Sequence, residues 1–204
     1  QNNKWVNYRE IEFNYTVGTA GAVNNCSLWG NFNGIWHLNQ TNSSSINITG
    51  GINKFNLNLT DGNYIWNVLC SGTYSAFALN NFTLSIDSEQ PVLGIAYPLN
   101  NTVFRQNVSM PLNFTVSDAN LNSCLYSLNN GGLNYSLSCA NGDNNIVFGY
   151  AAGNYNLTIW ANDSAGNKNS SSVRFTIDTI HPSISITYPP NNTNSSNPNL
   201  NINY

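Results

Sequence analysis

The feature that most constrains this chain is an internal repeat with a constant offset of 91 residues, which separates Gly62 from Gly153 and Asp87 from Asp178. The two segments that begin and end at these residues align without a gap. The same offset continues beyond Asp178, so a third unit begins near residue 179. Self-similarity at a fixed period indicates an array of similar structural units.

Each unit contains short segments in which apolar and polar residues alternate. Alternation with a period of two is typical of β-strands that have one buried face. A disordered polar tract would lack aromatic residues, whereas this chain is 12% aromatic. We therefore predict an all-β protein. The alternation is clearest in residues 11–17, 64–70, 82–86, 112–116, 155–161 and 173–177.

A unit of about 90 residues with about seven short strands has the size of an immunoglobulin-like sandwich. The predicted fold is therefore a pair of tandem immunoglobulin-like β-sandwich domains. The first repeat covers residues 1–87 and lacks its leading strand, the second covers residues 88–178, and residues 179–204 are the first strands of a third repeat or a donor segment. In the second repeat we predict strands at residues 92–97, 110–117, 122–129, 133–139, 144–149, 154–161 and 170–178.

Charged residues are scarce. They make up 7% of the chain, against about 25% in a typical soluble domain, and the formal net charge is −3. The six cationic residues are spread singly, so we expect no nucleic-acid partner, which would need a basic patch. The apolar runs are too short to span a bilayer, and we expect no membrane insertion in this segment. An exported protein would have lost its leader or carry it outside this sequence.

Two longer motifs resemble a known family. Residues 116–132, which begin Val-Ser-Asp-Ala-Asn-Leu, and residues 161–178, which begin Ala-Asn-Asp-Ser-Ala-Gly-Asn, are similar to the tandem Ig-like repeats of archaeal cell-surface proteins. Residues 25–28 and 66–70 resemble a sister repeat type in the same group. The resemblance covers nearly the whole chain. It implies an extracellular Ig-like array with a structural or adhesive role.

The four cysteines fall into two candidate pairs. Cys26 begins strand C of the first immunoglobulin-like repeat and Cys70 ends strand F, and these strands are antiparallel neighbours in such a sandwich. Cys124 and Cys139 oppose each other if a hairpin turns at residues 131–132. Buried free thiols are the alternative, and metal binding is disfavoured because no clustered His or CxxC accompanies the cysteines. Two disulfides would indicate an oxidising compartment.

Asn-x-Ser/Thr sequons occur sixteen times. Part of this abundance is expected without glycosylation, because strands whose solvent-exposed face is built from Asn and Thr produce such sequences. Whether the sequons reflect strand composition or glycosylation, their asparagines should point to solvent, where a glycan can be attached. We expect covalent N-glycans. The candidate sites are Asn14, Asn25, Asn39, Asn42, Asn47, Asn58, Asn81, Asn100, Asn107, Asn113, Asn134, Asn156, Asn162, Asn169, Asn191 and Asn194.

No catalytic constellation is evident, and we predict that the chain is not an enzyme. His37 and His181 lie in different repeats. The turn at residues 163–167 offers oxygen atoms to calcium, with Asp118 or Asp178 nearby. The same residues suit a hairpin turn in which an Asp caps its own backbone. We expect the turn, and neither a metal nor a cofactor.

Surface aromatic residues are the remaining candidates for a binding site. Trp160 falls on the polar face of its strand, while Trp29 and Trp36 flank a stretch rich in Gly and Asn. Each could stack on a sugar ring. Packing against a neighbouring domain, glycan or subunit is the alternative.

The links between units contain a proline and about four residues, at residues 87–91 and again at residues 178–182. Such links favour a rod. The strand that follows, with Ile184, Ile186 and Tyr188, has no domain of its own in this sequence. Either the sequence is a window cut from a longer repetitive chain, or this strand completes the first repeat of a neighbouring copy by β-strand addition.

We therefore predict an extracellular, cell-surface structural repeat protein, part of a filament, stalk or coat. Its partners are identical copies or neighbouring repeats in an open polymer, and glycans are a further candidate. An adhesin that binds partner-cell glycans through exposed aromatic residues is the alternative function. An accessory module of an extracellular enzyme is a third, and it would need a catalytic domain outside this sequence.

Overall fold

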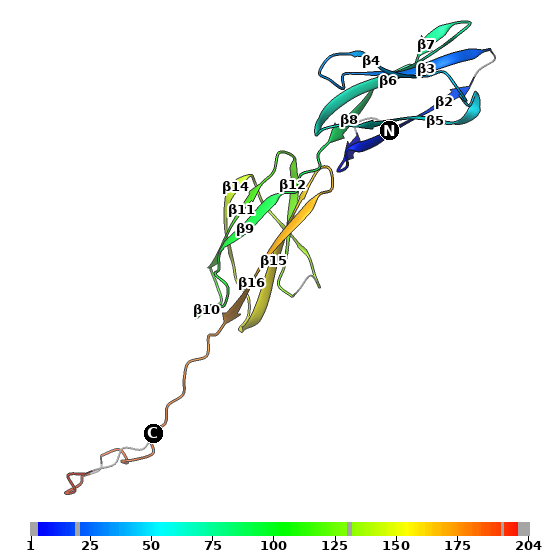
Figure 1. The fold of residues 1–204 in the computed structure, drawn as a ribbon. Coiled ribbons are helices and arrows are strands. Elements are labelled where there is room, and N and C mark those ends of the chain that lie inside the picture. The colour runs from blue at the N-terminus through cyan, green and yellow to red at the C-terminus, as the bar shows by residue number, and fades with distance from the viewer. Residues whose placement is uncertain (1–3, 19–20, 130–131, 193, 200–204) are drawn as a thin grey trace.

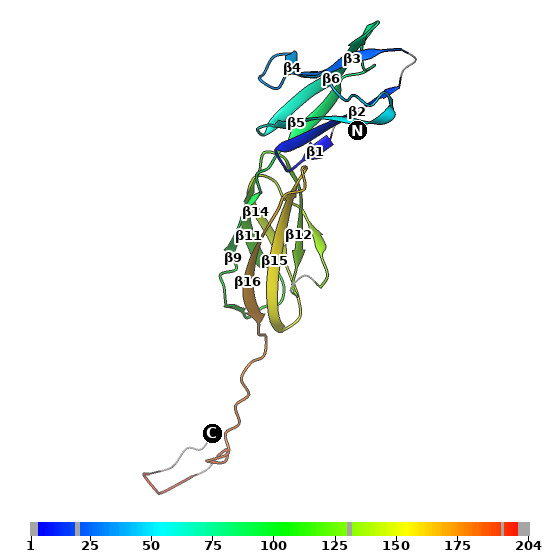
Figure 2. The ribbon, with the colours of Figure 1, turned by 45° about the vertical axis from the view of Figure 1, so that its right-hand side comes forward.

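The computed structural model describes residues 4–18, 21–129, 132–192 and 194–199. They form two β-sandwiches arranged end to end, followed by an extended segment that leads away from the second sandwich (Figure 1, Figure 2). The fold is all-β and consists of tandem immunoglobulin-like β-sandwich domains, as predicted. The described part of the chain holds no helix of the length and apolarity that crossing a membrane requires.

The first sandwich packs a six-stranded sheet against a two-stranded one. Its strands are β1 (Lys4–Val6), β2 (Glu10–Gly18), β3 (Val23–Gly30), β4 (His37–Asn42), β5 (Thr49–Asn58), β6 (Gly62–Gly72), β7 (Ser75–Phe77) and β8 (Phe82–Ile86). β2 and β5 form the smaller sheet, and β1 runs parallel to β8 at the edge of the larger one. Because side chains alternate between the faces of a strand, Phe13, Leu28 and Phe55 point inward and share one core.

The second sandwich packs a five-stranded sheet against a three-stranded one. Its strands are β9 (Val92–Tyr97), β10 (Thr102–Phe104), β11 (Met110–Ser117), β12 (Leu121–Ser127), β13 (Tyr135–Leu137), β14 (Gly142–Phe148), β15 (Gly153–Asp163) and β16 (Lys168–Ile177). Phe114, Leu157 and Phe175 lie in a core separate from that of the first sandwich. Each repeat therefore buries its own apolar residues.

The two repeats share one strand order. The edge-to-edge order β1-β8-β6-β3-β4 corresponds to β10-β16-β15-β12-β13, and β5 and β2 correspond to β14 and β11. Asn53 and Asn144 mark the correspondence, because each amide bonds the backbone of the preceding turn in the same way. β9, which pairs with β11, has no counterpart among the described residues of the first repeat.

Two three-residue strands, β1 and β10, were not predicted from the sequence. Each pairs in parallel with the last strand of its repeat. The first repeat thus retains the strand equivalent to β10. Among its described residues, it has no equivalent of β9, the leading strand on the opposite sheet.

The hairpin register predicted around Cys124 is wrong by two residues. Cys124 faces Leu137 rather than Cys139. The reason lies in the connection, which is longer than a two-glycine turn: Leu128 is buried, and its carbonyl accepts the Asn156 N–H. Gly131, where the turn was predicted, lies outside the described residues. So does the second strand expected for the third repeat, at residues 200–204.

Candidate functional site

The outer edge of β2 is the clearest difference between the two repeats. In the second repeat β9 covers the same edge of β11, with Leu93 opposite Val116 and Ile95 opposite Phe114. Among the residues that the structure describes, β2 pairs with β5 alone. A row of unpaired N–H and C=O groups along a strand is a template for a further strand.

A groove of about 760 Å³ borders this edge of β2. It lies between β2 and β8, the position that β9 takes beside β16 in the second repeat. Phe13, Trp66 and Leu84 contribute apolar surface, while Glu10 and Glu12 belong to its polar part. The groove therefore joins an apolar base to a strand edge that can form backbone hydrogen bonds.

The segment predicted to donate a strand lies at the opposite end of the molecule (Figure 1). Residues 183–187 belong to no strand. Ile184 is 80% exposed and Ile186 is 70% exposed, which is unusual for alternating isoleucines. By the offset of 91, Ile184, Ile186 and Tyr188 stand where Leu93, Ile95 and Tyr97 pack against the core of the second repeat.

Both cysteine pairs suggested by the sequence are bonded. Cys26 and Cys70 face each other across β3 and β6, with Cα atoms 4.0 Å apart. Cys124 on β12 is bonded to Cys139, which follows β13, and their Cα atoms are 6.0 Å apart. Each disulfide lies within one repeat, so neither one joins the repeats to each other.

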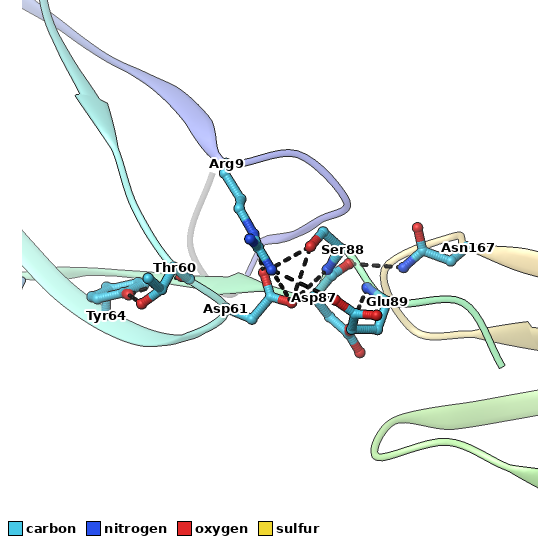
Figure 3. Close-up of polar contacts among 8 residues, drawn as sticks. All are labelled: Arg9, Thr60, Asp61, Tyr64, Asp87, Ser88, Glu89 and Asn167. Carbon is cyan, nitrogen blue, oxygen red and sulfur yellow. Dashed lines mark hydrogen bonds and ion pairs between the residues drawn. The ribbon is translucent and has the colours of Figure 1, made fainter. Parts of the chain in front are cut away.

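The junction between the repeats is closed by amide side chains of the second repeat. Asn167 Nδ2 donates to the carbonyl oxygen of Asp87 at 2.8 Å (Figure 3). Asn120 Nδ2 donates to the Asp87 carboxylate at 2.6 Å, and Asn169 Nδ2 donates to the carbonyl oxygen of Pro91 at 2.8 Å. Asp87 is only 6% exposed. These bonds hold the linker against the end of the second sandwich.

On the side of the first repeat, Asp61 anchors the same linker (Figure 3). Its carboxylate accepts hydrogen bonds from the backbone N–H and the hydroxyl of Ser88, and it pairs with Arg9 Nε at 3.0 Å. Arg9 Nη2 also lies 3.6 Å from a Glu89 carboxylate oxygen. The hydrogen bond from Arg9 is the main reason that the pKa of the Asp61 carboxyl lies below its ordinary value.

Three carboxylates meet at the junction. Asp87, Asp118 and Asp163 each place an oxygen within 4.8 Å of the other two. Burial, and then repulsion by Asp87 and Asp163, raises the pKa of Asp118. Asp163 also accepts two backbone N–H bonds from its own turn, the capping role expected from the sequence. Asp178 is exposed at the far end of β16 and takes no part. A divalent cation would find one oxygen ligand on each of the three.

None of the sixteen sequon asparagines lies in a core: ten are exposed and six are half-buried. Asn14 and Asn81 point to solvent, as expected, while Asn113 and Asn156 are half-buried. The side chain of Asn169 is committed to the junction through its bond to Pro91. The half-buried sites are Asn25, Asn42, Asn113, Asn156, Asn162 and Asn169.

Two of the three candidate tryptophans lie together. Trp29 and Trp36 both pack against Phe77, with ring centroids 5.8 and 6.4 Å away. Trp36 is 41% exposed, and the buried Trp29 Nε1 has no hydrogen-bond partner within the described residues. Trp160 is half-buried on β15, in the other repeat.

No protein-family model matches the chain, and no curated protein matches its sequence. Among solved structures, the fibronectin(III)-like modules of CbhA from Clostridium thermocellum are similar, with a TM-score of 0.51 and 12% identity over 90% of this chain and 95% of that chain. A chimeric titin Z1Z2 tandem aligns with 84% of this chain and 92% of its own, at 12% identity and a TM-score of 0.35. The first similarity supports the class of fold, a tandem of fibronectin III-like or immunoglobulin-like β-sandwich modules.

Proposed function

We propose that this chain is an extracellular structural repeat protein, a subunit or segment of a surface filament, stalk or coat assembled head to tail. The junction carries this proposal. Three amide side chains of the second repeat, of which Asn167 is buried, bind Asp87 and Pro91, and these bonds support a stiff connection between the two sandwiches. Repeats stacked in one direction build length without closing.

Three features of the chain support a place outside the cell. Two disulfides suit an oxidising compartment. Sixteen sequons, ten of them with an exposed asparagine, and few charges suit a surface kept soluble by glycans. The motifs at residues 116–132 and 161–178 resemble those of archaeal cell-surface repeats, and we extend the proposal to that class of organism.

The proposal is tested on native cells by immunogold electron microscopy and on the purified chain by small-angle X-ray scattering. We expect label on surface filaments or coat, and scattering from a stiff rod. Asn167→Ala should make the two repeats flexible relative to each other, whereas Asn145→Ala, an exposed asparagine on β14, should not. Label confined to the cell interior would contradict the function. A flexible wild-type chain would contradict the rod.

An adhesin remains the second candidate, because Trp36 and Phe77 form an exposed aromatic surface over Trp29. Aromatic rings of this kind stack on sugar rings. A glycan array probed with the wild-type chain and with Trp36→Ala tests it, and Trp160→Ala on the other repeat is the matched control. A signal lost only in the first variant would favour adhesion.

A further inference from the structure

We propose that the open edge of β2 binds residues 183–188 of a second copy of this chain as an added antiparallel strand. The inference rests on the proposed head-to-tail function and names the contact that would produce it. The occupant is defined because the same molecule already shows the completed arrangement, in which β9 covers β11.

The register of the added strand follows from the second repeat. β9 pairs with β11 so that Gly94 faces Thr115, and Leu93 and Ile95 lie on either side of that pair. The counterpart of Thr115 in β2 is Thr16, because Phe114 and Tyr15 face the equivalent residues Asn144 and Asn53. Offset by 91, the donor residue opposite Thr16 is therefore Ser185, with Ile184 opposite Val17 and Ile186 opposite Tyr15.

The donor residues suit this register. Ile184 and Ile186 would take the places of Leu93 and Ile95, which pack against the core of the second repeat. Ser185 would replace Gly94, where an added Cβ would stand 3.5 Å from Thr115 Oγ1, an ordinary contact. The turn that follows is also the same in both segments, since Asn101 and Asn192 have φ angles of 65° and 64°.

The donor must come from another copy. From Asp178 to Ser183 the chain can span at most about 18 Å. The groove lies beyond the whole length of the second sandwich, in which the ten residues of β16 alone extend about 33 Å. The extended segment also leads away from both sandwiches (Figure 1, Figure 2). Donation between copies would repeat the stacking that already joins the first repeat to the second.

Cysteine cross-linking tests the register directly. A chain carrying Thr16→Cys is mixed with a chain carrying Ser185→Cys under mild oxidation, and we expect a disulfide-linked dimer on a non-reducing gel. The matched control pairs Thr16→Cys with Thr187→Cys, which lies two residues along the donor on the same face as Ser185, and it should give little dimer. No dimer from two folded variants, or equal dimer from both pairs, would overturn the proposal.

Assembly of the unmodified 204-residue chain provides the second test, by light scattering as a function of concentration. We expect oligomers that grow with concentration and that disappear in the double variant Ile184→Asp, Ile186→Asp. Ile180→Asp is the control, because Ile180 is 81% exposed in the linker, outside the donor strand. A wild-type chain that stays monomeric, or oligomers unaffected by the double variant, would assign the edge to another occupant and overturn the proposal. Surface labelling of native cells would then still stand as the separate test of the function.

Discussion

Replacing Asp118 by Asn should make the second repeat more stable at pH 7, because it removes one of three charges crowded at the junction. At 4.8 Å two unit charges repel by about 1 kcal/mol in water and by about 3.5 kcal/mol at an effective dielectric constant of about 20. Asp118 is partly exposed and has two such neighbours. We therefore expect a gain of about 2 kcal/mol. The Asn side chain keeps an oxygen that can accept the Asn120 N–H, as Asp118 Oδ1 does at 2.7 Å.

The sign of the pH dependence follows from the raised pKa of Asp118. The folded chain holds this proton more tightly than the unfolded chain, whose carboxyl has its ordinary value near 3.8. The wild-type repeat therefore loses stability from this group as the pH rises from about 4 through the raised pKa. The Asp118→Asn variant has no carboxyl at this position, so its stability does not fall in this way as the pH rises. The two chains should be equally stable at about pH 3 and differ at pH 7.

Urea unfolding at both pH values measures the difference, in a buffer that contains a chelator. The chelator matters because a divalent cation among the carboxylates would reverse the sign. Asp143→Asn, which removes an exposed charge from β14 of the same repeat, is the control and should change little. Equal or lower stability of Asp118→Asn at pH 7 would refute the repulsion argument.

Three further predictions concern the disulfides, the Arg9 ion pair and the glycans. Replacing Cys26 and Cys70 by Ala frees a loop of 44 residues and should lower the unfolding free energy by about 4 kcal/mol in chemical denaturation. Arg9→Ala should flatten the acid limb of the first repeat's stability curve, because the lowered pKa of Asp61 stabilises the fold above about pH 4 and that stability is lost on acidification. Glycopeptide mass spectrometry should find Asn169 unoccupied while the exposed sequons carry glycans, since the amide of Asn169 is engaged at the junction.

The repeat and the alternation of side chains were enough to predict much of the fold. β9 and β11 begin and end where the sequence placed them. The cysteine pairs could also be predicted, because strand order in a sandwich brings Cys26 opposite Cys70. These features could be predicted because each depends on the residues of one strand or of one pair of neighbouring strands.

Features that combine distant segments were harder to predict. β1 and β10 have three residues each and pair in parallel, too short to show a period. In the cluster of Asp87, Asp118 and Asp163, the sequence suggested that Asp118 lies near the turn of Asp163, but it did not indicate Asp87, which belongs to the linker. Asn120 and Asn167 bind the linker at the junction, but no sequence pattern distinguishes them from the other asparagines among the 42 in the chain.

The parallel pairing of β1 with β8 determines how the first sandwich would respond to tension. A pull on the two ends of the first repeat enters at the start of β1 and leaves at the end of β8. Because these strands point the same way, the pull slides one along the other, and their hydrogen bonds are loaded together instead of opening one by one. β10 and β16 are also parallel in the second sandwich, but there the chain enters through β9, which pairs with β11. In the first module, the parallel pair β1 and β8 would therefore resist a pull along the chain with all of its hydrogen bonds at once.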